Sequence, residues 1–443
     1  MTDCIKPLSF VFSKKRRLEA DFSGGNLSSD GGLLLLRQLD ERLGFFEQFS
    51  SCLEDPRDPK RINHEQVELI RQRVLQICAG YEDANDSDVL RTDPIFKVAC
   101  NQLPESGKAL GSQPTITRLE NRVTKEELSK IRRLFVELFV SSFKKAPQEI
   151  VLDIDGYDDP THGNQQLSFY HGYYRQHMYH PVMVNHAGSG FPVLLQLRAG
   201  NSHAGKGVKG LLRWLFWRLR RAFPDVVITL RGDGGFSLPE IIKVCEQSNA
   251  YYVLGFSRNA VLERKNADLL EQARLQFMST RKKARLFDDV YYQAGTWDAP
   301  RRILMKAEYL EQGLNQRFVV TNRFEPAQEL YDEFYVQRAE DSENRIKELK
   351  LDLKADRLSC HAFIANQFRL YLHQLGFVLM LELRKAAQGT QFENARFSTL
   401  REKFVKLAVR VRESARRVWV QFASSCPVKK CFSLIAQKVA LQT

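Results

Sequence analysis

The stretch EIVLDIDG (149–156) decides the fold, because its β-branched and aliphatic residues predict a buried strand that also carries two charges. Side chains alternate between the two faces of a strand, so Asp153 and Asp155 share one face. A charge in such a strand is costly unless it is paired or holds a metal ion. The stretch therefore predicts a sheet that presents carboxylates for binding or chemistry.

Further strand-like runs follow in a recognisable order. Short runs separated by turn residues come first, then a helix at 206–223, a strand, a helix at 238–248 and a last strand. The runs are LSFYHGYY (167–174), HPVMVNH (180–186), FPVLLQL (191–197), VVITLRGD (226–233) and YYVLGF (251–256). Hairpin-linked strands followed by alternating helix and strand predict an α/β fold, an RNase H-like mixed sheet flanked by helices.

Outside this core the pattern changes, and it divides the chain into five regions. The segment after the last strand is charged and contains short strand-like pieces, which predicts a β-rich insertion before the last helix of the core. The predicted regions are an N-terminal mainly helical DNA-binding region (1–145), the first part of the core (146–256), the insertion (257–317), the second part of the core with a Glu-bearing helix (318–390) and a basic C-terminal region (391–443).

The net charge of the chain indicates which classes of molecule it could bind. The chain of 443 residues has 66 Lys and Arg against 53 Asp and Glu, a formal charge of +13, which favours polyanions. Nucleic acid is the first candidate and an anionic membrane surface the second. The longest apolar stretch, GFVLMLEL (376–383), is far shorter than the roughly 20 residues that span a bilayer, so we expect no membrane partner and a cytoplasmic protein.

Two further acidic residues stand where a metal site could use them. Asp233 ends an apolar strand between two glycines, where a phosphate backbone could approach closely. Glu343 begins ENRIKELK (343–350), a helical stretch in which Lys347 and Lys350 follow one and two turns later. Carboxylate oxygens suit Mg²⁺, and a pair of such ions can clamp both oxygens of a phosphodiester displacement.

Each motif alone also has a plain structural explanation. A strand-end aspartate is more often a turn residue, and Glu343 with Lys347 is more often a surface pair. It is their combination with the strand order and the basic charge that indicates a metal-dependent enzyme acting on DNA.

Six segments, in this order, resemble the DDE transposases of bacterial insertion sequences, group 1, of the thirteen-eighty type. They are LSSDGGLLLLRQLDERLGF (27–45), SQPTITRLEN (112–121), DIDGYDDPTHGNQQ (153–166), LRAGNSHAGKG (197–207), LRGDGGF (230–236) and YVQRAEDSENRIKELK (335–350). Together they extend over nearly the whole chain, and the combination is specific where no single segment is.

The resemblance implies a transposase that cuts at the ends of its element and joins them to target DNA, by cut and paste. It implies Asp155, Asp233 and Glu343 as the catalytic acids that hold two Mg²⁺, for which Mn²⁺ would substitute. It also implies the Tyr-Arg-Glu-Lys pattern of related transposases. The residues expected at DNA phosphates are Tyr335, Arg338, Lys347 and Lys350. The implied partner is double-stranded DNA, both terminal inverted repeats and target, bound by a homodimer in the bacterial nucleoid.

Two departures from the family pattern leave alternatives open. Four residues separate Arg338 from Glu343 where the family has three, so Glu340 competes with Glu343 as the acid. Asp153 competes with Asp155, because the two share a face of the strand. Two other functions also remain: a metal-dependent nuclease or resolvase that cuts without joining, and a DNA-binding derivative without chemistry.

Aromatic residues supply the last candidates. From its context we expect Trp297 in the insertion to be exposed, where it could stack on a flipped base; the alternative is a Trp that belongs to a small β-core. The aromatic and basic residues of YHGYYRQH (170–177) could contact the DNA backbone or fill a sheet edge. His177 and His180 could suggest a metal site, but on antiparallel strands we expect them to line a turn or contact DNA.

Overall fold

The computed structural model describes residues 7–12 and 15–441, apart from the side chains of residues 339–341 and 441. The chain forms two compact units. One contains residues 55–119 together with the residues before 52 and those from 379 onward, and the other contains residues 52–54 and 120–378. The N-terminal and C-terminal regions of the sequence thus contribute to the same unit, while α7 (Lys125–Ser141) belongs to the unit that contains the sheet.

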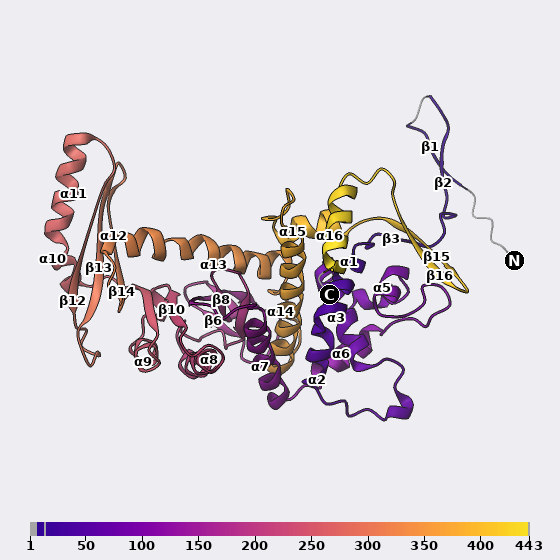
Figure 1. Cartoon of the computed structure of the whole chain (residues 1–443), viewed down its shortest axis with the longest axis horizontal. Coiled ribbons are helices and arrows are strands. Elements are labelled where there is room, and N and C mark those ends of the chain that lie inside the picture. The colour runs from indigo at the N-terminus through magenta and orange to yellow at the C-terminus, as the bar shows by residue number, and fades with distance from the viewer. Residues whose placement is uncertain (1–6, 13–14, 442–443) are drawn as a thin grey trace. The chain divides into compact units, whose positions relative to one another are not determined.

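The second unit is organised by a mixed sheet of eight strands (Figure 1). Strand β10 pairs in parallel with both β4 and β11, and the other pairings in this sheet are antiparallel. The order across the sheet is β12 (Ala284–Tyr292), β13 (Arg301–Leu310), β14 (Gly313–Thr321), β11 (Tyr251–Phe256), β10 (Val227–Gly232), β4 (Glu149–Gly156), β8 (Val182–His186) and β9 (Pro192–Gln196).

The alternation of β4 separates its apolar and acidic residues. Ile150, Leu152 and Ile154 are fully buried, while Asp153 and Asp155 face the opposite side. Helices α8 (Val208–Ala222) and α9 (Pro239–Gln247) lie on one side of the sheet and α13 (Gln337–Lys347) lies on the other (Figure 1). The acidic side chains of β4 are on the side of α13, because two residues of that helix contact Asp155.

One predicted strand differs from the structure. Residues 167–174 do not form a strand of the main sheet, and only Phe169–His171 (β6) is extended. This strand belongs to a separate three-stranded sheet with β5 (Asp159–Pro160) and β7 (Gln176–Tyr179). The aromatic residues that suggested a core strand are largely exposed, and the chain turns at residues 172–175. Aromatic content alone does not distinguish a buried strand from an exposed hairpin.

The insertion extends the main sheet by three strands and also contains helices α10 (Ala260–Lys265) and α11 (Ala267–Thr280). Residues 318–321, at which the predicted second part of the core begins, are the end of β14. Strand β14 pairs with β13 along its whole length and with β11 through Phe318–Thr321. One long strand therefore joins the insertion to the core.

The helical segment after the insertion contains two stretches of π-helix. The chain passes from α12 (Ala327–Glu329) through the π-helical residues Leu330–Tyr335 into α13, then through the π-helical residues Glu348–Asp352. The amide N–H of Val336 donates to Tyr331 O at 3.0 Å, and that of Leu353 to Glu348 O at 3.0 Å, both five residues back. Such turns accommodate one extra residue in a helix. Helix α14 (Phe363–Ala386) follows.

The first unit combines helices from the N-terminal region with the C-terminal residues. Its three-stranded sheet places β15 (Val409–Ser414) between β16 (Arg417–Phe422) and β3 (Leu27–Ser28). The remaining elements of this part of the sequence are β1 (Leu8–Phe10), β2 (Leu18–Ala20), α1 (Leu33–Leu43), α2 (Phe45–Ser51), α3 (Gln66–Ala79), α4 (Asp86–Leu90), α5 (Pro94–Ala99), α6 (Gln113–Asn121), α15 (Phe397–Leu400) and α16 (Lys429–Leu441). Among the described residues, no helix has the length and apolarity needed to cross a bilayer.

Candidate active site

Asp155 and Asp233 lie at the carboxyl ends of two adjacent parallel strands. The register pairs Ile154 of β4 with Gly232 of β10, so the next residue on each strand is one of the two aspartates. Neighbouring strands are about 4.8 Å apart. The Asp233 charge is one of the causes that raise the pKa of Asp155, after burial. The two carboxylates therefore interact at one end of the sheet.

Asp155 is held by two residues of α13. Its Oδ2 accepts from Arg338 Nη1 at 2.7 Å and from the Ser342 hydroxyl. The side chain of Asp155 is 14% exposed, and burial raises its pKa above the ordinary value although Arg338 and Ser342 oppose this. Because Asp155 is buried and has a carboxylate neighbour, an additional positive charge would stabilise its ionised form.

Tyr335 and Gly255 complete the wall around Asp233. Asp233 Oδ1 accepts from the amide N–H of Gly235 at 2.9 Å, which fixes the turn after β10. A Cβ on Gly255 would lie 2.6 Å from the Tyr335 hydroxyl and 2.9 Å from Gly234 N, so only glycine allows this approach. The Arg338 guanidinium lies over the Tyr335 ring, 5.9 Å from its centroid. Of the predicted residues, Tyr335 and Arg338 thus lie beside Asp155 and Asp233.

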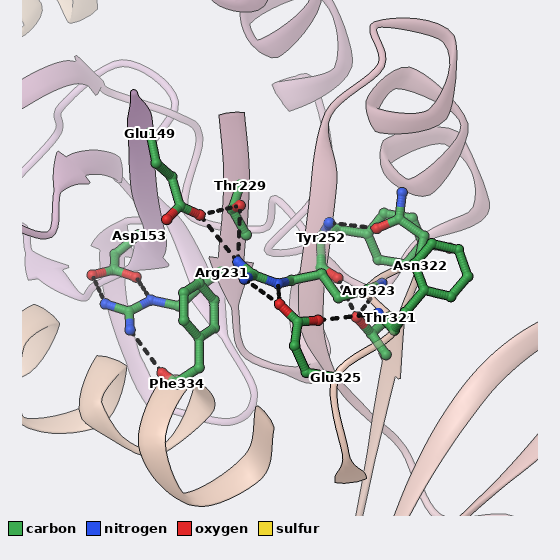
Figure 2. A network of polar contacts seen from close by, with 11 residues as sticks. Glu149, Asp153, Thr229, Arg231, Tyr252, Thr321, Asn322, Arg323, Glu325 and Phe334 are labelled. Atoms are coloured by element: carbon green, nitrogen blue, oxygen red, sulfur yellow. Dashed lines mark hydrogen bonds and ion pairs between the residues drawn. The ribbon is translucent and has the colours of Figure 1, made fainter. Parts of the chain in front are cut away.

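Asp153, the alternative ligand, is in a closed ion pair (Figure 2). Arg231 donates to both of its oxygens, from Nε to Oδ1 at 2.7 Å and from Nη2 to Oδ2 at 2.9 Å. The third nitrogen of Arg231 donates to Phe334 O at 2.7 Å, just before Tyr335. Both charged side chains are almost completely buried. Asp153 therefore anchors the segment that leads into α13, and both its oxygens have partners.

Glu343 lies away from these carboxylates in this structure. Its side chain is 65% exposed and accepts from Lys347 Nζ at 3.1 Å, the i,i+4 surface pair considered as the plain explanation. In an α-helix the residue four positions after Arg338 shares its face, and that residue is Ser342. Glu343, five positions after Arg338, points in another direction. The extra residue in the sequence thus explains why a serine contacts Asp155.

The predicted phosphate-binding lysines also have partners. Lys347 is bound to Glu343, and Lys350 donates to Asp158 Oδ1 at 2.6 Å. Although burial opposes it, Lys350 holds the pKa of Asp158 below its ordinary value. The side chain of Glu340, the competing acid, lies outside the described residues.

The expectation that Trp297 is exposed is wrong. The residue is 6% exposed, and its ring packs on Phe256 with centroids 5.2 Å apart and on Tyr292 at 5.9 Å. The Arg301 guanidinium covers it at 5.3 Å. The loop AGTWDAP suggested exposure because it is rich in turn residues, but it folds back on the sheet. Trp297 therefore belongs to the alternative that was considered, a small β-core, and cannot stack on a base in this arrangement.

Two of the three carboxylates needed for a metal site are together. Asp155 and Asp233 offer oxygen donors at the carboxyl ends of neighbouring strands, and their mutual repulsion would be relieved by a divalent cation. In the described part of the chain, no group of three or more His, Cys, Asp or Glu side chains is placed to hold a metal ion. The donor pair fits a cation, and a third donor would have to come from a residue that lies elsewhere in this structure.

Two site residues were missed in the sequence. Ser342 contacts Asp155, and the four-residue spacing between Arg338 and Glu343 was the signal, because it places Ser342 on the face of Arg338. Asp158 binds Lys350 and also accepts from Gln176 Nε2 at 3.1 Å. Its place two residues after the end of β4 could have identified it.

Comparison with known proteins identifies the family. The family described as transposase DDE domain, group 1, matches residues 10–443. A comparison with curated proteins finds no match. Among solved structures, the cryo-EM structure of a piggyBac transposase synaptic complex with hairpin DNA matches with 12% sequence identity and a TM-score of 0.40, covering 85% of this chain and 81% of that chain. Because the family match extends over almost the entire sequence, this chain belongs to the group 1 DDE-domain transposases.

Proposed function

We propose that this chain cuts DNA at the ends of a mobile element and joins the freed 3′-hydroxyl groups to target DNA. The observation that carries the proposal is the meeting of Asp155 and Asp233 at the ends of parallel strands β4 and β10, opposite Arg338. The order β9-β8-β4-β10-β11 supports an RNase H-like core, in which ligands bind at the carboxyl ends of the central strands. Cut-and-paste movement is the form of transposition that we propose.

Asp155 and Asp233 would hold the divalent metal ions, which we propose to be two Mg²⁺, with Mn²⁺ as a substitute. Bound ions of this kind supply polarisation of the phosphate and lower the pKa of the attacking hydroxyl. Their binding requires ionised carboxylates. Because burial raises the pKa of Asp155, we expect cleavage to increase with pH as this group loses its proton.

We propose Glu343 as the third acid, brought in by a one-residue change in the hydrogen bonding of α13. A π-turn between Arg338 and Glu343 would move Glu343 toward the face that Ser342 now occupies. The same helical segment already contains π-turns on both sides of α13, at Leu330–Tyr335 and Glu348–Asp352. Extra residues in helices are commonly accommodated in this way, often at functional sites.

Arg338 would then change partner. In the structure it neutralises Asp155 through a single nitrogen, Nη1. Once the carboxylate is neutralised by a cation, the guanidinium is available for the phosphate next to the scissile bond, a geometry that arginine suits. We propose the same role for Lys347 and Lys350, whose present partners are Glu343 and Asp158.

The proposed substrate is double-stranded DNA, both the terminal inverted repeats and the target. The formal charge of +13 supports a polyanionic partner, and binding should weaken steeply with salt through counterion release. Two ends must be held in one complex before joining, so we propose that two copies of the chain act together on DNA.

The test is an assay of cutting and joining with labelled DNA that carries the element's end and a target plasmid. With Mg²⁺ we expect both a cleaved end and a joined product, and neither in the presence of a chelator or with Asp155→Asn. Cleavage without joined product would favour the nuclease or resolvase alternative. Binding without cleavage by the wild-type chain would favour a DNA-binding derivative and contradict the proposal.

A further inference from the structure

We propose that the exposed tip of the β6–β7 hairpin stacks on an unpaired base of the DNA end beside Asp155, with Tyr173 as the stacking residue. This inference rests on the proposed function, because it assigns the residue that holds the DNA end at the same site. The hairpin is formed by β6 and β7, whose register pairs Tyr170 with His177 and His171 with Gln176.

Tyr173 is unusually exposed for an aromatic residue. It lies in the turn at residues 172–175, and 84% of its surface is accessible. The Tyr174 ring supports it edge-on, with ring centroids 5.0 Å apart and planes at 87°. This contact uses little of its surface, so Tyr173 offers a supported ring to solvent. Any of the four bases can stack on such a ring, so this contact does not depend on the DNA sequence.

A continuous series of rings connects Tyr173 to the catalytic strand. Tyr174 contacts His171 at 5.1 Å and His180 at 6.1 Å between centroids. His180 in turn lies against Gly156, because a Cβ there would be 2.7 Å from its Nε2. Gly156 directly follows Asp155. The tip is therefore connected to the first catalytic acid through three rings.

The base of this series is rigid. His180 is buried, and its Nδ1 donates to Ser202 O at 2.8 Å. Arg198 Nε donates to His180 O at 2.9 Å, which fixes the backbone at the same position. After burial, the Asp158, Asp233 and Asp155 charges contribute to raising the pKa of Tyr174, so its phenol lies within electrostatic reach of the carboxylates. The hairpin thus presents Tyr173 from a fixed platform beside the site.

The charge of the surrounding sequence fits DNA. No Asp or Glu occurs between Asp159 and Asp225, whereas Arg175 at the hairpin tip is exposed. The basic residues between these two aspartates are Arg175, Arg198, Lys206, Lys209, Arg213, Arg218, Arg220 and Arg221. The segment that carries the exposed ring therefore adds no carboxylate repulsion of its own to the approach of a phosphate backbone.

The experiment uses duplex DNA carrying the element's end, with 2-aminopurine at one terminal position at a time, and the Asp155→Asn chain so that no cutting occurs. We expect fluorescence quenching on binding at one position. Tyr173→Ala in this background should abolish the quenching and weaken binding about five- to hundredfold, whereas Tyr173→Trp should retain both. Because the side chain is so exposed, the melting temperature should be unchanged.

The matched control is Tyr291→Ala. Tyr291 is also exposed, at 63%, but lies on β12, five strands from β4 and about 24 Å away across the sheet. It should leave quenching and binding unchanged. Quenching that persists in Tyr173→Ala, or its absence at every position in the parent, would overturn the inference. If the wild-type chain fails to cut while the quenching depends on Tyr173, the proposed chemistry fails and the stacking inference stands.

Discussion

Asp153 and Asp155 lie on the same face of β4, and each forms an ion pair with one arginine. The two ion pairs differ in how many carboxylate oxygens the arginine occupies. Asp153 uses both oxygens on Arg231, and both side chains are almost completely buried. Asp155 uses one oxygen, shared between Arg338 and Ser342, and after burial the Asp233 charge also raises its pKa. The first pair is a structural anchor, and we propose that the second exchanges its arginine for a cation.

The largest effect on DNA cleavage should come from substitutions of Asp155 and its neighbour Asp233. We expect Asp155→Asn and Asp233→Asn each to reduce DNA cleavage on the order of a thousandfold, since metal ions supply several kcal/mol of transition-state stabilisation. Asparagine has nearly the same shape, so the chain should remain folded and bind DNA. Cleavage rates and filter binding measure the two. Near-normal cleavage by either variant would remove that residue from the site.

Breaking the ion pair between Asp153 and Arg231 should lower the stability of the fold rather than the rate of DNA cleavage. Asp153→Asn leaves the buried Arg231 charge without its counter-ion, which costs about 3–5 kcal/mol. Denaturant unfolding measures this loss. The double variant Asp153→Asn, Arg231→Met should recover much of it, because no uncompensated charge remains. A stable Asp153→Asn variant that cannot cut DNA would instead make Asp153 the metal ligand.

The third acid can be tested by moving it along α13. Glu343→Gln should lower cleavage by roughly a hundredfold, equivalent to about 3 kcal/mol. The exchange Ser342→Glu, Glu343→Ser puts a carboxylate at the position that already contacts Asp155 and should restore cleavage. Glu340→Gln is the control and should cut normally. Activity in Glu343→Gln but not in Glu340→Gln would mean that Glu340 is the acid.

The smallest effect is expected at Asp159, and it concerns stability. Unlike Asp153 and Asp155, this buried aspartate has no arginine bonded to it within the part of the chain that the structure describes. Asp159 is fully buried, and neither carboxylate oxygen has a hydrogen-bond partner among the described residues. Burial, and then the Asp356 charge, raise the pKa of Asp159 well above its ordinary value. The unfolded chain thus releases this proton at lower pH than the folded chain, so stability falls as pH rises above the ordinary pKa.

Asp159→Asn removes that dependence. We expect the variant to melt at a higher temperature than the wild type at neutral pH, and at a similar temperature below the ordinary carboxyl pKa. Thermal unfolding across this range measures the difference. A variant that is less stable at neutral pH would show that the ionised carboxylate has a stabilising partner.

The sequence predicted the centre of the sheet well because its strands are short apolar runs that are buried almost continuously. The runs at 149–156, 226–233 and 251–256 form β4, β10 and β11, and the resemblance pointed to Asp155 and Asp233 at their ends. Such runs can be recognised locally, because turn residues bound them on both sides. The run at 167–174 predicts a core strand but forms part of an exposed hairpin, because a buried strand and an exposed hairpin can have the same aromatic composition.

The helix that carries Glu343 was harder to predict, because its outcome depends on one residue of register. Composition gives a helix at this position, but it does not decide whether Ser342 or Glu343 faces Asp155. That choice depends on where π-turns occur, which tertiary contacts determine. Trp297 was misjudged for a related reason, since the partners that bury it, Phe256 and Tyr292, come from other strands.

The most direct measurement is the binding of Mn²⁺ to the DNA-free chain, followed by electron paramagnetic resonance. Asp155 and Asp233 together are predicted to be required, so Asp155→Asn and Asp233→Asn should each weaken Mn²⁺ binding by tenfold or more. Asp159→Asn should bind as the wild type does. Binding of Mn²⁺ that is unaffected by either substitution would contradict the claim that these two carboxylates form the metal site.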